Sequence, residues 1–265
     1  MRASSFTPKI WHRLKDFVAR ATRAELALPP WWLRDVGGTD FKETGEEFLR
    51  IFIDIAGLQP CERVLEIGCG SGRMALPLTR YLETGAYAGV DVSVESIAWC
   101  QRHIARHHPN FSFVHADLYN KRYNPGGEQL ARAYTFPFDE RGFDFIFLTS
   151  VFTHLLPLDT KHYLEEVERL LAPDGRALFT FFILNAQQRE LAEAGRNAIQ
   201  FRHGKGPCRF RDAELPESAV AYRESFLLAE VNASGLALKD AVHYGTWTGR
   251  IDGLSYQDIL VVGLV

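Results

Sequence analysis

Three carboxylates of this sequence lie in or directly after short apolar runs, where they could hold a polar ligand. Glu66 lies within the first run, Asp91 follows the second, and Asp117 ends the third. A carboxylate at the end of a parallel strand, about 20 residues after a glycine turn, is placed to accept hydrogen bonds from both ribose hydroxyls of a nucleotide. Asp91 has this spacing. The alternatives are that Asp91 and Asp117 cap the next helix or turn, and that Glu66 is a solvated acid.

Glycines alternate directly after the first apolar run, at Gly68, Gly70 and Gly72, and an apolar helical pattern follows over 74–82. A strand, a glycine turn and a helix in this order let the backbone approach a ligand at the helix N-terminus. Cys69 is small enough to fit within such a turn. On its own, the motif predicts either a ligand-binding loop or a plain strand-to-helix turn.

A histidine follows the fourth apolar run. His154 comes shortly after Thr149 and Ser150, at the end of a strand expected over 143–150. Imidazole titrates near neutral pH, which suits a general base. The alternative is a histidine that only packs beside a cofactor. His243 and Tyr244, near the end of the chain, are rival candidates for the base.

Apolar runs alternate with stretches of helical periodicity through most of the chain. This alternation predicts an α/β fold with a mainly parallel sheet and helices on both faces. The expected strands are 64–67, 87–90, 110–117, 143–150, 176–183, 236–243 and 257–264. The expected helices are 8–27, 41–56, 74–82, 95–107, 160–171, 185–195 and 218–234.

Composition excludes several classes of protein. The 265 residues are 46% hydrophobic, enough for a sizeable core, and the net charge of -3 gives no sign of nucleic-acid binding. The 4 cysteines have neither metal-ligand nor disulfide-framework spacing, so we expect reduced thiols in a cytoplasmic protein. We expect no membrane span, because no apolar run reaches the ~18 residues that one requires.

The ordered series over about residues 60–183 resembles the class I S-adenosylmethionine-dependent methyltransferases. An acid two residues before alternating glycines is similar to their cofactor loop, Asp91 to their ribose-binding acid, and 116–118 to their adenine-binding segment. The resemblance implies a Rossmann-like, seven-stranded sheet whose last strand is antiparallel. A Rossmann-like domain without methyl transfer is the alternative.

The resemblance also implies a cofactor and a set of residues that bind it. S-adenosyl-L-methionine would be the cofactor and S-adenosyl-L-homocysteine the product. The implied cofactor-binding residues are Glu66, Gly68, Cys69, Gly70, Asp91, Val92, Asp117, Leu118 and Thr149. Residues 149–154 lack both the Asn/Asp-Pro-Pro-aromatic signature of amino-methylating relatives and the acidic ligands of metal-dependent O-methyltransferases. We therefore expect a metal-free enzyme with His154 as its catalytic residue.

Segments outside the expected sheet are candidates for the acceptor site. Residues 1–56 form an N-terminal helical extension, and 57–265 the methyltransferase domain with insertions at 119–142 and 185–235. The basic helix over 8–27 packs on the domain or a second subunit, or else lies on a membrane surface. Trp31 and Trp32 are packing anchors or an aromatic lid. The candidate substrate-binding residues are Tyr119, Tyr123, His243, Tyr244, Trp247 and Arg250.

The sequence therefore predicts methyl transfer to a small-molecule acceptor, with a saccharide or natural-product hydroxyl favoured. The basic run 200–211 is either a solvated loop or a site for an acceptor that carries phosphate or carboxylate. N-methylation of a small molecule is one alternative. A non-catalytic cofactor-binding module that acts at a partner or a membrane surface is another. A homodimer is compatible with the sequence.

Overall fold

A computed structural model describes residues 28–34, 40–195, 197 and 199–265 of the chain. The helix expected over 8–27 lies outside the described residues. The first described element is the short helix η1 (Trp31–Leu33), which follows Pro29 and Pro30.

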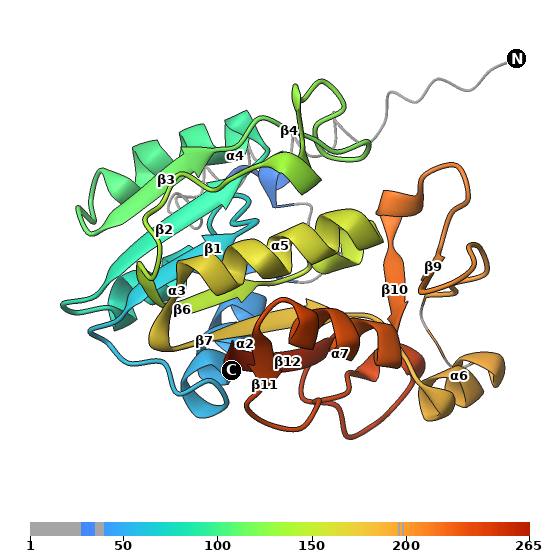
Figure 1. Ribbon diagram of the computed structural model, residues 1–265. Helices are drawn as coiled ribbons and strands as arrows, with labels where there is room; N and C mark the ends of the chain where they lie inside the picture. Colours follow the sequence, from blue (N-terminus) through green and yellow to red (C-terminus); the bar gives the residue numbers. More distant parts are fainter. Residues whose placement is uncertain (1–27, 35–39, 196, 198) are drawn as a thin grey trace, which may run out of the picture.

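A seven-stranded sheet forms the centre of the molecule, in the order β11-β12-β7-β6-β1-β2-β3 (Figure 1). Its strands are β1 (Arg63–Ile67), β2 (Ala86–Asp91), β3 (Phe111–His115), β6 (Phe143–Leu148), β7 (Leu171–Phe181), β11 (Leu236–Leu238) and β12 (Asp258–Leu264). Neighbouring strands from β7 to β3 are parallel, whereas β12 is antiparallel to both β7 and β11. The predicted α/β, Rossmann-like fold with an antiparallel last strand is confirmed.

Helices cover both faces of this sheet. One face carries α2 (Phe41–Asp54), α3 (Ala75–Tyr81) and α4 (Val94–Cys100), which continues as the π-helical turn η2 (Gln101–Ala105). The other face carries α5 (Pro157–Leu170) and α7 (Glu224–Ala233). Short helices and α6 complete the set: η3 (Ala131–Ala133), η4 (Phe152–His154), α6 (Ala186–Glu193), η5 (Pro216–Ser218) and η6 (Thr246–Thr248).

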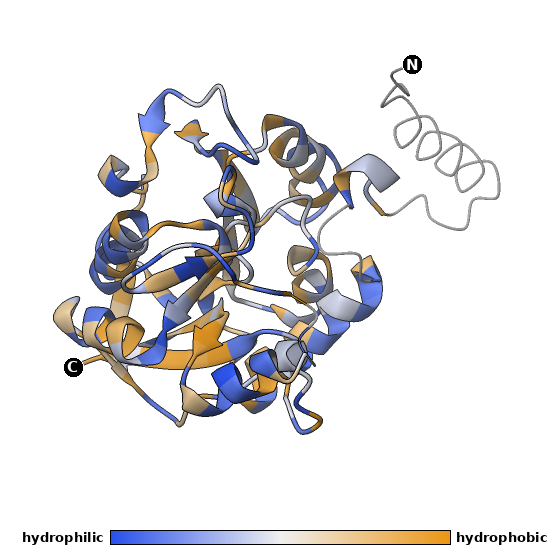
Figure 2. Cartoon of the chain, turned by 90° about the vertical axis from the view of Figure 1, so that its right-hand side faces the viewer, coloured by the Kyte–Doolittle hydropathy of each residue, from blue (hydrophilic) through white to orange (hydrophobic). Residues whose placement is uncertain are grey.

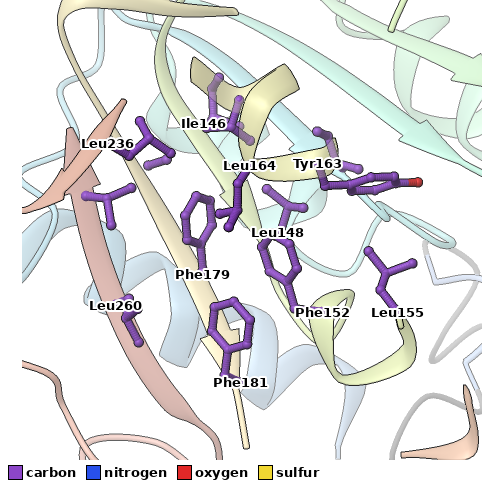
Figure 3. Packing of buried hydrophobic residues seen from close by; sticks show 14 of the residues in the cluster. Ile146, Leu148, Phe152, Leu155, Tyr163, Leu164, Phe179, Phe181, Leu236 and Leu260 are labelled. Atoms are coloured by element: carbon purple, nitrogen blue, oxygen red, sulfur yellow. The ribbon is translucent and has the colours of Figure 1, made fainter. Parts of the chain in front are cut away.

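Side chains of β6 show how the two faces are built. Ile146 and Leu148 pack toward Leu164 of α5 (Figure 3), whereas the intervening Phe147 packs toward Phe52 of α2 with ring centroids 4.4 Å apart. Successive strand residues point to opposite faces, so a continuous apolar run is what a strand buried on both faces requires. Figure 2 shows the resulting concentration of hydrophobic residues along the strands.

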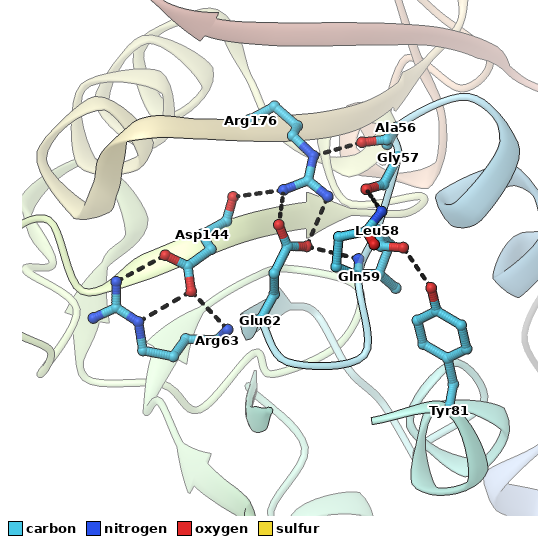
Figure 4. Close-up of polar contacts among 9 residues, drawn as sticks. All are labelled: Ala56, Gly57, Leu58, Gln59, Glu62, Arg63, Tyr81, Asp144 and Arg176. Atoms are coloured by element: carbon cyan, nitrogen blue, oxygen red, sulfur yellow. Dashed lines mark hydrogen bonds and ion pairs between the residues drawn. The ribbon is translucent and has the colours of Figure 1, made fainter. Parts of the chain in front are cut away.

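Ion pairs connect the neighbouring strands β1, β6 and β7 at one end of the sheet (Figure 4). Arg63 donates to both carboxylate oxygens of Asp144, at 3.1 Å from Nε and 2.8 Å from Nη2. Arg176 makes a bidentate pair with Glu62, both N–O distances being 2.7 Å. Arg63 and Asp144 lie at the beginnings of β1 and β6, and Arg176 of β7 pairs with Phe145 beside them. These ion pairs therefore stabilise the sheet at the end opposite the strand ends that bind ligands in such folds.

The predicted helix over 218–234 is wrong in its first part. Residues Val220–Arg223 form β10, and α7 begins only at Glu224. β10 pairs with β8 (Ile183–Leu184) and β9 (Cys208–Phe210) in a three-stranded sheet, and Tyr222 is fully buried against the main core. Pairing and burial thus override the helical periodicity of the sequence.

Two other boundaries differ from the prediction. β7 begins at Leu171 rather than at Arg176, and its pairing with β6 is irregular between these two residues. β11 ends at Leu238 rather than near His243. In the segment after β3, two short strands pair in parallel, β4 (Leu118–Tyr119) and β5 (Gln129–Leu130).

Candidate active site

A cavity of about 300 Å³ lies where β1, β2 and β6 end, at the carboxyl edge of the parallel strands. Ligands of open α/β sheets bind at this edge. Nine of the residues predicted from the sequence line the cavity: Gly68, Gly70, Asp91, Val92, Leu118, Tyr119, Tyr123, Thr149 and His154. Cofactor candidates and acceptor candidates therefore meet in one space.

Asp91, the last residue of β2, is fixed by the turn that it faces. Its Oδ2 accepts the backbone N–H of Gly70 at 2.7 Å, and its Oδ1 accepts that of Ser93 at 2.8 Å. Burial raises the pKa of Asp91, while the N–H groups of Ser93 and Gly70 oppose that rise. Each carboxylate oxygen has a further lone pair, so Asp91 can still accept hydroxyl donors from a ligand.

The glycine turn requires its glycines for two different reasons. Gly68 has φ +85°, and a Cβ there would lie 2.3 Å from Cγ2 of Val151. Gly70 has φ +49°, and no atom lies within 4 Å of the position that a Cβ would take. Gly68 therefore permits close packing against the segment after β6, whereas Gly70 presents bare backbone to the cavity.

The end of β6 is strained. Ser150 has φ 60°, a left-handed conformation that is uncommon outside glycine. Its backbone N–H donates to Oγ1 of Thr180 at 2.7 Å, and its hydroxyl donates to Oε1 of Gln257 at 3.1 Å. These contacts hold a sharp turn that brings Val151 and His154 to the cavity. Strained residues of this kind cluster at functional sites.

His154 is held in one tautomer. Its Nδ1 lies 2.8 Å from the carbonyl oxygen of Glu217, so Nδ1 carries the proton. Nε2 is then an acceptor, and the Tyr123 hydroxyl donates to it at 3.2 Å. Burial lowers the pKa of His154 to about 4, and the charges of Arg122 and Arg211 act in the same direction. The imidazole is therefore neutral at physiological pH.

Three predicted cofactor residues lie near the cavity without lining it. Glu66 is buried on the α2–α4 side, where it accepts a hydrogen bond from the Tyr87 hydroxyl, because strand alternation directs Leu65 and Ile67 to the opposite face. Cys69 is buried beneath the turn. Asp117 accepts a hydrogen bond from Nδ2 of Asn124 at 3.0 Å. Glu66 therefore joins β1 to β2, the Cys69 thiol contacts the carbonyl of Gly70 within the turn, and Asp117 orders the following loop.

The four predicted acceptor residues near the C-terminus do not line this cavity. They belong to the connection between β11 and β12, strands at the end of the sheet away from β1 and β2. Trp247 is fully buried and donates from Nε1 to Asp258 at 2.9 Å. His243 contacts Asp240, Tyr244 donates to Glu224, and the Arg250 guanidinium lies 5.2 Å above the Tyr244 ring. We do not assign them to the acceptor site.

Other residues complete the cavity without having been singled out as site residues. The segment 119–142 contributes Asn120, Ala131 and Phe136 beside the two predicted tyrosines. Trp32 of η1 also lines the cavity and is 50% exposed, which is compatible with the aromatic lid that the sequence offered as one of two roles. Leu155 and Tyr163 add apolar surface. These residues come from separate parts of the chain, and only tertiary packing brings them together.

Two kinds of feature are absent from the described part of the chain. There, no group of three or more His, Cys, Asp or Glu side chains is placed to hold a metal ion. Among the same residues, no helix combines the length and the apolar character that crossing a bilayer requires.

Comparisons with known proteins place this site in a family. A family model described as a methyltransferase domain matches residues 64–175. A phthiotriol/phenolphthiotriol dimycocerosates methyltransferase of Mycobacterium ulcerans is 34% identical over 120 residues, 45% of this chain and 37% of that protein. A fatty-acid O-methyltransferase of Mycolicibacterium smegmatis is 34% identical over 121 residues, 45% of this chain and 36% of that protein. The chain thus spans little more than a third of these curated relatives.

Solved structures share the fold over nearly the whole chain. The PH0226 protein of Pyrococcus horikoshii has a TM-score of 0.60 at 15% identity, over 88% of this chain and 95% of that one. A TehB-like S-adenosylmethionine-dependent methyltransferase of Corynebacterium glutamicum has a TM-score of 0.51 at 18% identity, over 96% and 98%. Residues 64–175 therefore match the methyltransferase domain family, and the chain shares the class I fold of S-adenosylmethionine-dependent methyltransferases.

Proposed function

We propose that this chain transfers the methyl group of S-adenosylmethionine to an oxygen atom of a small-molecule or lipid acceptor. The observation that carries the proposal is the cavity itself. It joins Asp91 and the glycine turn to His154 and Tyr123 in one space. Cofactor-holding and proton-accepting groups are therefore close enough to serve a single reaction.

The residues of the cavity fit the proposed cofactor. Asp91 keeps lone pairs for ribose hydroxyls, and the bare backbone at Gly70 leaves room for the methionine part. Val92, Ala116 and Leu118 supply apolar surface for the adenine ring. When bound, S-adenosylmethionine supplies a methyl group on a positively charged sulfur.

His154 and Tyr123 would handle the proton of the acceptor. The neutral imidazole presents Nε2 as a proton acceptor, and the Tyr123 hydroxyl donates to that nitrogen. An acceptor hydroxyl can replace Tyr123 at Nε2, or pass its proton through the tyrosine hydroxyl. The apolar surroundings exclude water and strengthen such hydrogen bonds.

The walls of the cavity favour an acceptor with an apolar body. Leu155, Phe136 and Tyr163 are among its lining residues, and the ring of Phe136 packs edge-on against that of Tyr163 with centroids 5.3 Å apart. The names of the two mycobacterial relatives describe acceptors of lipid type. A natural-product hydroxyl, one of the two predicted acceptors, or a lipid oxygen therefore fits these walls better than a saccharide hydroxyl does.

Transfer of a deuterated methyl group tests this proposal. The protein would be incubated with deuteromethyl S-adenosylmethionine and a panel of hydroxylated lipids, phenols, fatty acids, sugars and amines. Mass spectrometry of the products should show label on oxygen in an apolar member. Label confined to amines would favour the N-methylation alternative, and binding of the cofactor without turnover would favour the non-catalytic module.

A further inference from the structure

A second cavity of about 300 Å³ lies beside the three-stranded sheet and shares no lining residue with the first. The strands alternate their side chains, so Tyr222 of β10 joins the main core while Ala221 packs with Phe182 and Trp247. Arg223 extends to the Ala221 side. The second cavity therefore lies on the face of this sheet that is turned away from the main core. Figure 1 shows β9, β10 and α6 grouped at one end of the molecule.

Positive charge dominates the polar lining of this cavity. Arg189 of α6, Arg209 of β9 and Arg223 of β10 face it together with a single acid, Glu193. Among the described residues, none of these three arginines forms an ion pair, although Arg63 and Arg176 elsewhere do. Within the described residues, the side chain of Arg209 donates to the backbone carbonyls of Gly206 and Cys208. The guanidinium groups are thus available to an anion from outside the chain.

An amide in the same lining has an unused acceptor. Asn197 donates its side-chain N–H to the carbonyl of Ile199, but its Oδ1 is buried without a hydrogen-bond partner in the described part of the chain. A buried acceptor without a partner costs free energy, so such atoms in native proteins call for a donor. A ligand hydroxyl or amino group would supply it.

We propose that the second cavity binds a small organic anion, a phosphate or carboxylate that also carries a hydroxyl or amino group. Guanidinium groups match the planar geometry of carboxylate and phosphate oxygens and bind them through paired hydrogen bonds. Asn197 accepts a hydrogen bond from the ligand. Leu184, Phe201 and Trp247 provide the apolar wall for its carbon skeleton. Arg209 belongs to the basic run 200–211, and no residue of that run lines the first cavity.

Calorimetry with glycerol phosphate and glycerate tests this site in the full-length protein. At least one of them should bind saturably with one site per chain. Arg209→Gln and Arg223→Gln should each weaken that binding at least tenfold, and Arg223→Glu should abolish it. Arg106→Gln is the matched control, because Arg106 is an exposed arginine that lines neither cavity. The affinity of the Arg106→Gln variant for the same probe should stay within twofold of that of wild type.

Three results would overturn the second site. They are absence of saturable binding by both probes, equal weakening in Arg106→Gln, and association only with phosphatidic-acid vesicles while the free probes do not bind. S-adenosylhomocysteine affinity, measured in the same variants, should be unchanged. Because the two ligands are measured separately, failure to bind S-adenosylhomocysteine would contradict the proposed function and leave the anion site standing.

Discussion

At the scale of single residues, the protonation state of His154 determines how a proton can leave the acceptor. His154→Ala should lower kcat about 100-fold, as expected for the loss of a general base. Tyr123→Phe should lower it less, because Nε2 remains. Since burial lowers the pKa of His154 to about 4, kcat should show no step near pH 6.5 that depends on this residue. Undiminished kcat in His154→Ala at saturating substrate would rule out the base role.

Glu66 should make the stability of the protein depend on pH. Burial raises its pKa from 4.5 to about 8 in the folded protein, although the Tyr87 hydroxyl opposes that rise. Between these values the native state retains a proton that the unfolded state has released. The free energy of unfolding should therefore fall as pH rises through this window.

Glu66→Gln isolates that effect, because glutamine keeps an acceptor for Tyr87 but does not titrate. Urea unfolding at pH 5 and pH 8.5 would measure it. The variant should gain stability relative to wild type at the higher pH. A difference between the two proteins that is the same at both pH values would show that Glu66 does not titrate in this window.

Sequence reasoning located some site residues better than others, for physical reasons. Asp91 could be placed because a strand end fixes both its position and its direction. Glu66 lies in the middle of a strand, so its side chain points to the face opposite Leu65, and spacing from the glycines alone did not show this. Tyr244 and Arg250 pack on each other near Glu224, a contact that depends on the three-dimensional course of the loop.

At the scale of elements, the glycine turn packs closely against the segment that follows β6. Gly68→Ala should destabilise the fold by about 2–4 kcal/mol, because its methyl would overlap Val151 and its φ is left-handed. Gly70→Ala is the matched comparison and should cost about 1 kcal/mol. Its methyl should instead weaken S-adenosylhomocysteine binding.

Chemical denaturation and calorimetry of the two glycine variants would separate these effects. Equal losses of stability in both variants would contradict the fitted packing of Gly68 against Val151.

Some element boundaries are determined by local sequence signals, and others by tertiary contacts. α2 begins where the sequence predicts, because Asp40 caps it by accepting the N–H of Glu43 at 2.8 Å. The sequence wrongly predicted β10 as part of a helix. Its pairing partners β8 and β9 are separated by a long connecting segment, so the local sequence does not indicate the pairing. Local signals fix a helix cap, whereas strand pairing across about 40 residues depends on the assembled fold.

At the scale of the whole molecule, strand order explains why one cavity gathers residues from distant segments. β1 lies between β2 and β6, so the glycine turn, Asp91 and the segment 149–154 meet at one edge. The alternation of strands and helices predicted this sheet. The segment around Tyr123 and the short helix η1 line the cavity through side-chain packing, which sequence periodicity does not encode.

The central claim is that this cavity holds S-adenosylmethionine. Titration calorimetry with the product S-adenosylhomocysteine tests it most directly, with a nicotinamide dinucleotide as the competing ligand and Asp91→Asn as the variant. We expect one S-adenosylhomocysteine bound per chain, no dinucleotide binding, and affinity at least tenfold weaker in Asp91→Asn. Binding of the dinucleotide without binding of S-adenosylhomocysteine would contradict the account.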